Sequence, residues 1–254
     1  MSNLLFSTKS LSKKEEDLME ISIINTGENS ATENMRIDEA LLKSLDPKGL
    51  PKLHLYKWKG DCATYGHFSK PENLLDLGFA KKKNLSLAKR ITGGGVTFHF
   101  SDYAFSFLMP KKHLNISDNT LEKYRFVNQF VIKAVAACMG SEENLDYFDP
   151  CQNNDSMSMQ FCMAKPTKYD VLYNGKKVGG AAQRKTNNGY LHHGTVSIAM
   201  PDLSYLSELL LSKEVYKAIC ENSFYFVKNH LEKKELEFFR QKVEKNLIEA
   251  FLKF

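Results

Sequence analysis

Hydrophobic and polar positions alternate along several short stretches of this chain, and longer stretches carry the period of an amphipathic helix. The alternating stretches predict strands at residues 21–24, 53–58, 104–109, 169–173, 176–183 and 190–200. The helical period predicts helices at residues 30–45, 119–139, 205–220 and 231–254. Because the strands cluster in the middle of the chain and the helices surround them, we expect an α+β fold.

Turn and cap residues mark several boundaries between these elements. Ser30 followed by Glu33 has the spacing of a capping box, and Asn174-Gly175 is typical of a hairpin turn. Residues 62–68 form either a further strand or a segment where two backbones approach each other closely. Residues 140–160 are polar and irregular, which is typical of a mobile loop that covers a site.

The composition, with 43% hydrophobic and 26% charged residues, is that of an ordinary soluble globular protein. We expect a flexible lead over residues 1–18 and a single domain over residues 19–254. The net charge of +5 is scattered along the chain, which argues against nucleic acid and suits an acidic protein partner. Five cysteines without a C-x-x-C pair argue for free thiols in a reducing compartment, and no apolar run reaches membrane-spanning length. We therefore expect a cytoplasmic protein that binds neither nucleic acid nor a membrane.

The stretch from Lys89 to His99 reads K-R-I-T-G-G-G-V-T-F-H and is the first candidate site. Three glycines without Cβ atoms let the backbone approach a ligand closely, and their N–H groups can form a concavity for an anion. Arg90 adds a positive charge just before the glycines. The stretch is therefore either a cradle for a phosphate or carboxylate or only a glycine-rich turn.

Two further stretches place polar residues among small ones. Lys177 precedes the small residues 179–182, so its amine either reaches across empty space to an anion or lies in solvent. His192 and His193 follow in a predicted strand, where neighbouring side chains point to opposite faces. Only one of these two histidines can therefore face a pocket.

Cys162 is the thiol in the most informative position, because it ends the polar loop close to two lysines. A cation near a thiol lowers its pKa, so Cys162 is either an activated thiolate or an idle cysteine. The chain has no G-x-S-x-G elbow of a serine hydrolase. Its seven histidines and five cysteines form no ligand set at the spacings known for metals.

Together these motifs resemble the lipoate–protein ligase and octanoyltransferase family, whose members share a BPL/LPL-type catalytic domain. The first stretch is similar to the family's R-R-x-(S/T)-G-G-G-x-(V/T)-(Y/F)-H motif. Asp170 with residues 175–183 looks like its D…G-(R/K)-K-(I/V)-(S/A)-G-(S/N)-A-Q segment, and residues 192–195 look like its H-H-G-T. The resemblance runs from about residue 30 to about residue 250, and three motifs in the family's order make it specific.

The resemblance implies a mixed β-sheet packed by helices and a tunnel that takes lipoate or octanoate as substrate. In the ligase branch, ATP and Mg²⁺ convert lipoate to lipoyl-AMP, which a lysine of a lipoyl carrier domain then attacks. The carrier would be a 2-oxoacid dehydrogenase E2 domain or a glycine cleavage H protein. Large ligases carry a C-terminal accessory domain that we expect this chain to lack, so ligation would need either a separate accessory subunit or a self-sufficient catalytic domain.

Carried over residue by residue, the resemblance assigns roles to side chains in all three motifs. Lys177 would bridge the acyl carboxylate and the α-phosphate, while Asp170 would bind Mg²⁺ or orient its neighbours. His193, together with His99, would line the acyl or adenylate pocket. The full set expected to bind ATP or lipoyl-AMP is Arg90, Gly93, Gly94, Gly95, Val96, Thr97, Phe98, His99, Asp170, Lys177, Gly180, Ala182 and His193.

Two departures from the ligase pattern keep a second activity open. The run after His99 is one residue shorter than the ligases' H-D-x-G-N, and a C-x-x-x-P-x-x-Y motif begins at Cys162. Both features are similar to octanoyltransferases that use a cysteine nucleophile without ATP, although that branch has arginine at the position of Gly95 and glutamine at that of His192.

We interpret the chain as an ATP-dependent lipoate–protein ligase in which Lys177 faces the glycine stretch across a narrow acyl slot. One alternative is an octanoyl or lipoyl transferase with Cys162 as thioester nucleophile and Lys177 polarising the carbonyl group. The other is a non-catalytic module that only binds lipoate.

Overall fold

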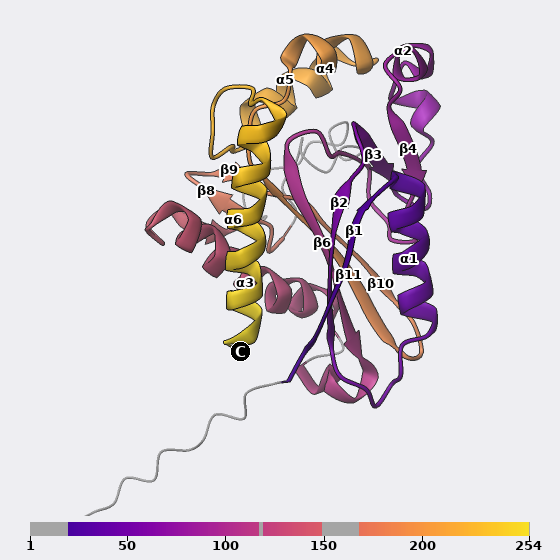
Figure 1. The fold of residues 1–254 in the computed structure, drawn as a ribbon, viewed down its shortest axis with the longest axis vertical. Helices are drawn as coiled ribbons and strands as arrows, with labels where there is room; N and C mark the ends of the chain where they lie inside the picture. The colour runs from indigo at the N-terminus through magenta and orange to yellow at the C-terminus, as the bar shows by residue number, and fades with distance from the viewer. Residues whose placement is uncertain (1–19, 117–118, 149–167, 254) are drawn as a thin grey trace, which may run out of the picture.

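The computed structural model describes residues 20–116, 119–148 and 168–253, and a five-stranded sheet forms the middle of its three layers (Figure 1). The strand order is β1-β2-β6-β11-β10. β1 and β2 run parallel and the other neighbours run antiparallel, so the sheet is mixed, as the resemblance implies. The strands are β1 (Ser22–Asn29), β2 (Lys52–Trp58), β6 (Asp102–Pro110), β10 (Ala181–Lys185) and β11 (Gly189–Ser197).

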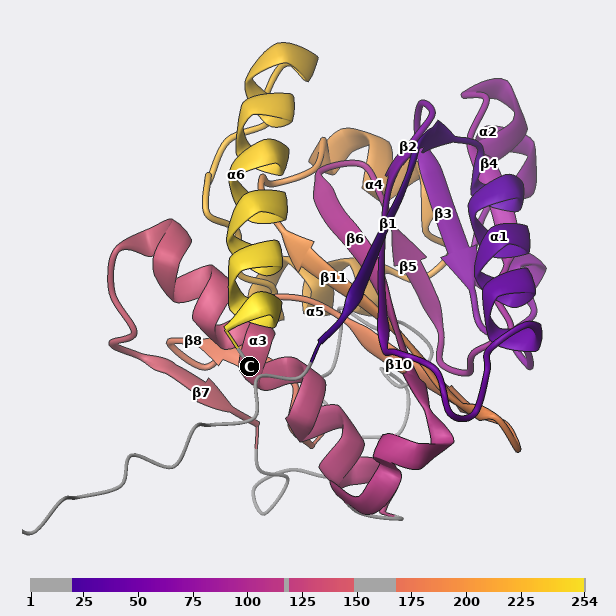
Figure 2. The same ribbon diagram turned by 60° about the horizontal axis from the view of Figure 1, so that its bottom comes forward.

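Helices α3 (Thr120–Met139) and α6 (Lys233–Leu252) cover one face of this sheet (Figure 2). Strand alternation sends the large apolar side chains of β6 to this side. The ring centroid of Phe251 on α6 lies 4.9 Å from that of Phe107 in β6 and 4.4 Å from that of Phe130 on α3. Burial of these rings stabilises the packing of both helices on the sheet.

The opposite face is covered by α1 (Ala31–Lys43) and by a smaller sheet of order β4-β3-β5. The helix begins where Ser30 accepts a hydrogen bond from the N–H of Glu33 at 3.2 Å, but the Glu33 carboxylate binds Arg36, so the capping box is half formed. The small sheet packs against three short helices. These elements are β3 (Cys62–Tyr65), β4 (Ser86–Lys89), β5 (Val96–Phe98), α2 (Leu77–Lys82), α4 (Leu203–Leu209) and α5 (Lys213–Asn222).

The single strand expected over residues 176–183 is wrong, because the chain changes sheets in the middle of this stretch. A Cβ atom on Gly179 would lie 1.7 Å from the carbonyl oxygen of Thr195, so the backbone passes too close to β11 to continue as one regular strand. The hairpin turn at Asn174-Gly175 is confirmed, with φ angles of 49° and 74°. The third sheet has the order β7-β8-β9, with bounds Leu145–Tyr147, Val171–Tyr173 and Lys176–Lys177.

The single helix expected over residues 205–220 is also wrong, because α4 and α5 are separate helices. Leu210 leaves the first helix and forms a β-bridge with Leu75. Ser212 then caps the second helix by accepting a hydrogen bond from the N–H of Val215 at 3.2 Å.

Residues 1–18 and 149–160, expected to form a flexible lead and part of a mobile loop, lie outside the described residues. The first part of the expected loop contains β7, so the irregular structure expected there is wrong. In the part of the chain that the structure describes, no helix combines the length and hydropathy needed to cross a lipid bilayer.

Candidate active site

The glycine stretch forms a loop between β4 and β5, and the side chain just before it fixes its shape. Arg90 is buried, and its guanidinium donates hydrogen bonds to the carbonyl oxygens of Gly93 at 3.0 Å and Gly95 at 2.8 Å. Gly94 lies between these carbonyl groups with a φ of 89°, which glycine adopts without strain. Arg90 therefore clamps the loop from inside and defines its curvature.

A second segment holds the glycine loop from outside. The backbone N–H groups of Gly66 and His67 and the hydroxyl group of Ser69 each donate to a carbonyl oxygen of the loop, at 2.8 to 3.3 Å. A Cβ atom on Gly66 would lie 1.9 Å from the carbonyl oxygen of Gly94. Residues 62–68 therefore combine the two structures expected of them, a strand followed by a close approach of two backbones.

Polar side chains form one row across three neighbouring strands of the large sheet. His54 in β2 and His193 in β11 are both cross-strand partners of Ser106 in β6. Asp38 on α1 lies over this row, with Oδ1 2.7 Å from Nδ1 of His54. Its Oδ2 lies 2.8 Å from Oγ of Ser106 and 3.0 Å from Nε2 of His193. All four side chains are buried, so the row is a polar network inside the protein.

This network connects α1 to the glycine loop. The hydroxyl group of Thr92 lies 3.0 Å from Nδ1 of His193. Burial alone would raise the pKa of Asp38, but the charge and hydrogen bonds of His193 and His54 outweigh burial and lower it to about 2. An ionised carboxylate only accepts hydrogen bonds, so Asp38 orients the ring of His193 and, through that ring, the hydroxyl group of Thr92.

A second hydrogen-bonded chain starts from His99 at the end of β5. Its Nδ1 lies 2.7 Å from Oδ2 of Asp102, and its Nε2 lies 3.0 Å from the hydroxyl group of Thr64. The same hydroxyl group accepts a hydrogen bond from Arg90 at 3.2 Å. The ring of Trp58 stacks on His99 with centroids 4.1 Å apart. These hydrogen bonds therefore connect the small sheet to the start of β6 and to Arg90, which clamps the glycine loop.

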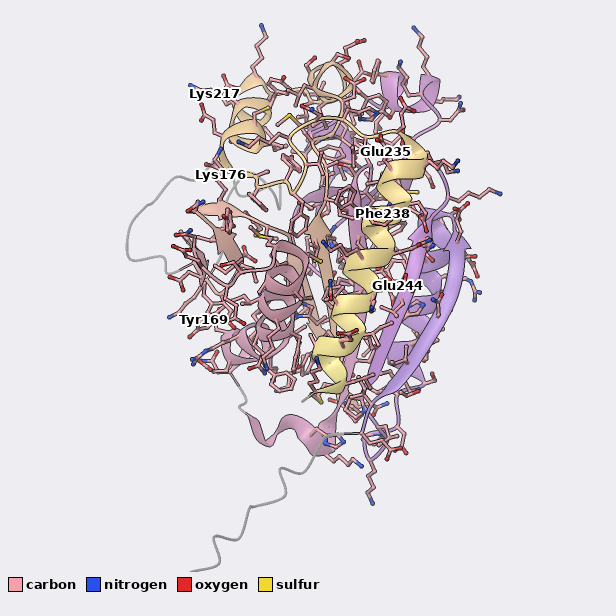
Figure 3. The ribbon with its side chains drawn as sticks, turned by 60° about the vertical axis from the view of Figure 1, so that its left-hand side comes forward. Tyr169, Lys176, Lys217, Glu235, Phe238 and Glu244 are labelled. Carbon is pink, nitrogen blue, oxygen red and sulfur yellow. The ribbon has the colours of Figure 1, made fainter. Side chains whose placement is uncertain are left out.

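The C-terminal helix α6 supports this second chain from behind. Arg240 donates to the carbonyl oxygen of Asp102 at 3.0 Å and to that of Phe100 at 3.3 Å. The hydroxyl group of Tyr103 donates to the carboxylate of Glu244 at 2.9 Å, and Figure 3 labels Glu244 on the helix. These contacts hold the backbone on both sides of Asp102 in place.

A cavity lies between the large sheet and the small sheet. The polar network around Asp38 and the hydrogen-bonded side chains around His99 both reach it, through His193 and His99. It encloses about 350 Å³ of space, part of it open to solvent. Its lining combines polar side chains (Thr64, Arg90, Thr97, His99, His193, Thr195), apolar side chains (Met35, Tyr56, Trp58, Ala104) and small residues (Gly180, Ala181, Ala182, Gly194). A mostly apolar lining with a few convergent polar groups is typical of a small-molecule site.

A second cavity, whose volume of about 430 Å³ includes space open to solvent, shares Thr97 and Thr195 with the first. Three aromatic side chains also line it, namely Phe98, Phe100 and Tyr225. The two cavities therefore adjoin one another at Thr97 and Thr195, the residues that line both.

The predicted site residues fall into three groups. Gly93, Gly94 and Gly95 form the clamped loop, and the side chain of Val96 is buried in the core of the small sheet. The predicted residues that line one or both cavities are Arg90, Thr97, Phe98, His99, Gly180, Ala182 and His193.

Lys177 and Asp170 form the third group, a buried ion pair with 2.7 Å between Nζ and Oδ2. Among the described residues, Lys177 does not line either cavity, although Gly180 three residues later lines the first. The juxtaposition of Lys177 with the glycine loop therefore stays a prediction. Cys162, the expected nucleophile of the transferase alternative, lies outside the described residues.

His192 faces away from the cavity, toward α3. Its ring centroid lies 5.6 Å from that of Tyr124, and the side-chain amide of Gln183 donates to its Nδ1 at 2.9 Å. Burial, and secondarily the charge of His193, lowers the pKa of His192 to about 3, so its ring is neutral. The prediction that only one of the two histidines faces a pocket is confirmed.

Sequence patterns do not single out Asp38, His54, Thr92 or Asp102 as site residues. A signal for part of the polar row was present, because His54 and Ser106 each lie between two large apolar residues in a strand. Such positions mark polar groups on the less apolar face of a sheet. That Asp38 lies over them depends on the packing of α1, which the strand pattern does not specify.

Mg²⁺ has no evident protein site in the described ranges, where no three His, Cys, Asp or Glu side chains could hold a metal ion together. Asp170 already pairs with the Lys177 amine. The ion pair fits the orienting role that the resemblance offers Asp170 as the alternative to metal binding.

A mixed sheet, a clamped glycine loop and two adjoining cavities define an α+β domain with a candidate small-molecule site. The family model of the lipoyl protein ligase A/B catalytic domain matches residues 30–252, so the chain belongs to this family. The resemblance drawn from the motifs is confirmed, and the protein is an enzyme of the lipoate–protein ligase and octanoyltransferase family.

Among curated relatives, the octanoyltransferase LipM of Bacillus cereus is 27% identical over 194 residues, which are 74% of this chain and 68% of that protein. The octanoyltransferase LipM of Oceanobacillus iheyensis is 28% identical over 177 residues, 69% of this chain and 63% of that protein.

Two solved structures share the fold. Lipoate-protein ligase A bound with ATP is 24% identical, with a TM-score of 0.67 over 92% of this chain and 84% of that one. A bi-partite lipoate protein ligase with its E2 lipoyl domain from Thermoplasma acidophilum is 23% identical, with a TM-score of 0.67 over 92% and 82%. These likenesses confirm the α+β fold with a mixed sheet.

Asp38→Asn should destabilise the protein by about 3 kcal/mol at neutral pH, because the buried histidines lose their charged acceptor. Glu39→Gln is the matched control on the same helix, and the partly exposed ion pair of Glu39 with Lys43 should be worth less than about 1 kcal/mol. Because the pKa of Asp38 is lowered from 3.8 to about 2, its stabilising effect is present above about pH 4 and lost as the pH falls through 2. Urea unfolding of both variants between acidic and neutral pH measures this, and equal unfolding midpoints would contradict it.

Gly66→Ala should destabilise the protein by about 2 kcal/mol or more, because the new methyl group would clash with the backbone of the glycine loop. Gly93→Ala is the control, since a Cβ atom there has no neighbour within 4 Å, and its stability should change by less than about 1 kcal/mol. Thermal unfolding compares the two. Similar losses in both variants would show that the close approach does not hold the loop.

Proposed function

We propose that this chain is a lipoate–protein ligase that activates lipoate with ATP and transfers the acyl group to a lysine of a lipoyl carrier domain. The observation that carries the proposal is the pair of adjoining cavities that meet at Thr97 and Thr195 beside the clamped glycine loop. An adenylating enzyme must hold an acid and a nucleotide with their reacting groups in contact. Two adjoining compartments next to a glycine loop whose backbone could bind an anion suit that requirement.

The reaction has two balanced steps. A carboxylate oxygen of lipoate attacks the α-phosphorus of ATP, and the bond to the departing pyrophosphate breaks. The amine of the carrier lysine then attacks the carbonyl carbon of the mixed anhydride, forms an amide and releases AMP together with a proton. Both steps develop negative charge at oxygen, so catalysis needs fixed cations and hydrogen-bond donors near these atoms.

Three groups of residues would serve these steps. Trp58, Tyr56 and Met35 would contact the acyl chain, since they supply the apolar part of the first cavity. Lys177, held by Asp170, would stabilise charge on the carboxylate and the α-phosphate. Mg²⁺ would neutralise the phosphates of ATP and would be held chiefly by those phosphates and water, as is usual for this ion.

Arg90 and His193 would act mainly by positioning. Arg90 gives its hydrogen bonds to the carbonyl oxygens of the loop, so its charge stabilises the loop and the anion beside it at once. His193 lines the first cavity while its ring is held by Asp38. The glycine loop can therefore present its backbone to a nucleotide in one fixed shape.

A second candidate is transfer of an octanoyl or lipoyl group from a thioester to the carrier lysine without ATP. Two relatives named octanoyltransferase LipM, 27% and 28% identical to this chain, favour it, as does the C-x-x-x-P-x-x-Y motif at Cys162. Cys162 would attack the thioester carbonyl and release the donor thiol, and the carrier lysine would then displace the Cys162 thiolate.

The carrier would be an E2 lipoyl domain of a 2-oxoacid dehydrogenase or a glycine cleavage H protein. The bi-partite ligase structure determined with its E2 lipoyl domain supports this choice of partner. We also propose that residues 19–254 form one catalytic domain and that the protein acts in the cytoplasm. If ligation by this chain alone is slow, we propose that a separate accessory subunit assists it.

One experiment distinguishes the candidates. The first mixture contains the protein, apo lipoyl domain, lipoate and Mg-ATP. The second contains the protein, apo lipoyl domain and octanoyl-acyl carrier protein without ATP. The mass of the lipoyl domain is then measured by mass spectrometry. We expect a lipoyl mass increase in the first mixture. Modification only in the second mixture, abolished by Cys162→Ser, would replace the ligase by the transferase. Lipoate binding without modification in either mixture would indicate a binding module.

Lys177→Met should lower the rate of acyl transfer by about 100-fold or more, because a fixed cation at the reacting carbonyl group is lost. It should also destabilise the fold, since the buried Asp170 carboxylate loses its paired ammonium group. The double variant Lys177→Met/Asp170→Asn removes both charges, so it should regain stability but not activity. Recovery of activity in the double variant would mean that Lys177 has only a structural role.

A further inference from the structure

One end of the molecule carries a groove that the proposed site does not use. The groove is lined by residues of the second half of α1, the glycine loop and the β10–β11 hairpin. Figure 1 labels α1 and β10 on its right-hand side. It encloses about 820 Å³ that is largely open to solvent, and Ile91, Arg184, Asn187 and Asn188 are among its lining residues.

The segments around this groove carry a marked excess of positive charge. Residues 39–49, 111–113 and 184–189 contribute six exposed cationic side chains but only two carboxylates, Glu39 and Asp46. We call these six the basic end surface: Lys43, Lys48, Lys111, Lys112, Arg184 and Lys185. With six cations and two carboxylates these segments carry a net charge of +4, so the positive charge is more concentrated at this end than its scatter along the sequence suggests.

Backbone hydrogen bonds hold these segments side by side. The N–H of Lys111 donates to the carbonyl oxygen of Asn188 at 2.8 Å, and the N–H of Lys112 donates to that of Pro47 at 2.9 Å. η2 (Lys111–Ile116) follows β6 directly, and in Figure 1 the hairpin end of β10 and the C-terminal end of α1 lie near each other at the lower right. The backbones that carry the basic end surface are therefore held next to one another, which keeps its positive charges at one end of the protein.

The groove and the proposed acyl site are neighbours along strand β10. Ala182 lines the first cavity and Arg184 lines the groove, and these residues lie two positions apart on β10, about 6.6 Å along one face of the strand. Ile91 lines the groove between Arg90, which clamps the glycine loop, and Thr92, which contacts His193. A protein seated in the groove would contact the back of the glycine loop.

We propose that the basic end surface docks an acidic face of the lipoyl carrier domain and so presents the carrier lysine to the acyl site. The inference rests on the proposed function, which requires a protein acceptor. Complementary charges beside a site speed and orient the encounter with such an acceptor. The groove suits a protein better than a nucleic acid, because its described lining residues include two amides and a carboxylate but no aromatic side chain for stacking on bases.

The test uses the full chain and an apo lipoyl domain of a 2-oxoacid dehydrogenase as probe. Lys111→Glu/Lys112→Glu and Arg184→Glu are compared with Lys81→Glu/Lys82→Glu, which makes the same change of charge as the first variant on α2, at the other end of the molecule in Figure 1. We expect the first two variants to bind the probe about tenfold more weakly, with a higher KM for it and an unchanged kcat. The α2 variant should change the affinity less than about twofold, and added salt should weaken wild-type binding.

Formation of the activated acyl group is measured separately. For the ligase it is the pyrophosphate that ATP releases in the presence of lipoate. For the transferase it is the mass increase of the protein when Cys162 takes up an octanoyl group. All surface variants should retain it, because none touches the proposed site. If the wild type forms no activated acyl group, the proposed function fails, while the binding comparison still decides the docking surface. Equal affinity in all variants, no binding of the probe by the wild type, or tight binding only of a duplex oligonucleotide would overturn the proposal.

Discussion

The architecture of the site depends on one buried carboxylate. Removing an ionised carboxylate from water costs several kcal/mol, and three hydrogen bonds to a charged acceptor each return about 1.5–3 kcal/mol. Asp38 has these three donors in His54, Ser106 and His193. The cost of desolvation and the stabilisation by the three hydrogen bonds are of similar size. Helix α1 and the strands β2, β6 and β11 must therefore keep their positions for Asp38 to stay ionised inside the protein. Through His193 the same requirement fixes Thr92 in the glycine loop.

Close packing of backbones is the second constraint. Gly66 and Gly179 lie where a side chain would collide with a carbonyl group, the first against the glycine loop and the second against β11. Arg90, which clamps the loop, and the small residues 180–182 line the same cavity, and the small side chains of that wall leave the cavity open. The catalytic domain therefore uses glycine for two purposes, to bring segments together and to leave space for a ligand.

Sequence patterns predict much of this fold and only part of the site. Long periodic elements such as α3 and α6 are found because their apolar faces are continuous. The strand over residues 176–183 is predicted wrongly because local alternation does not reveal that Gly179 passes from one sheet to another. The glycine loop is found because its chemistry is contiguous in sequence. The role of Asp38 in the site is not found, because its partners come from three strands that only the folded sheet brings into one row.

The two histidines nearest the cavity illustrate how the networks limit the chemistry. Both ring nitrogens of His193 are occupied, by Asp38 and Thr92, and both of His99 are occupied, by Asp102 and Thr64. A ring that must give up a hydrogen bond before it can accept a proton is poorly suited to act as a general base. The buried networks therefore hold these rings as positioning residues, and the rate of acyl transfer must come mainly from orientation and from fixed charge around the carbonyl group.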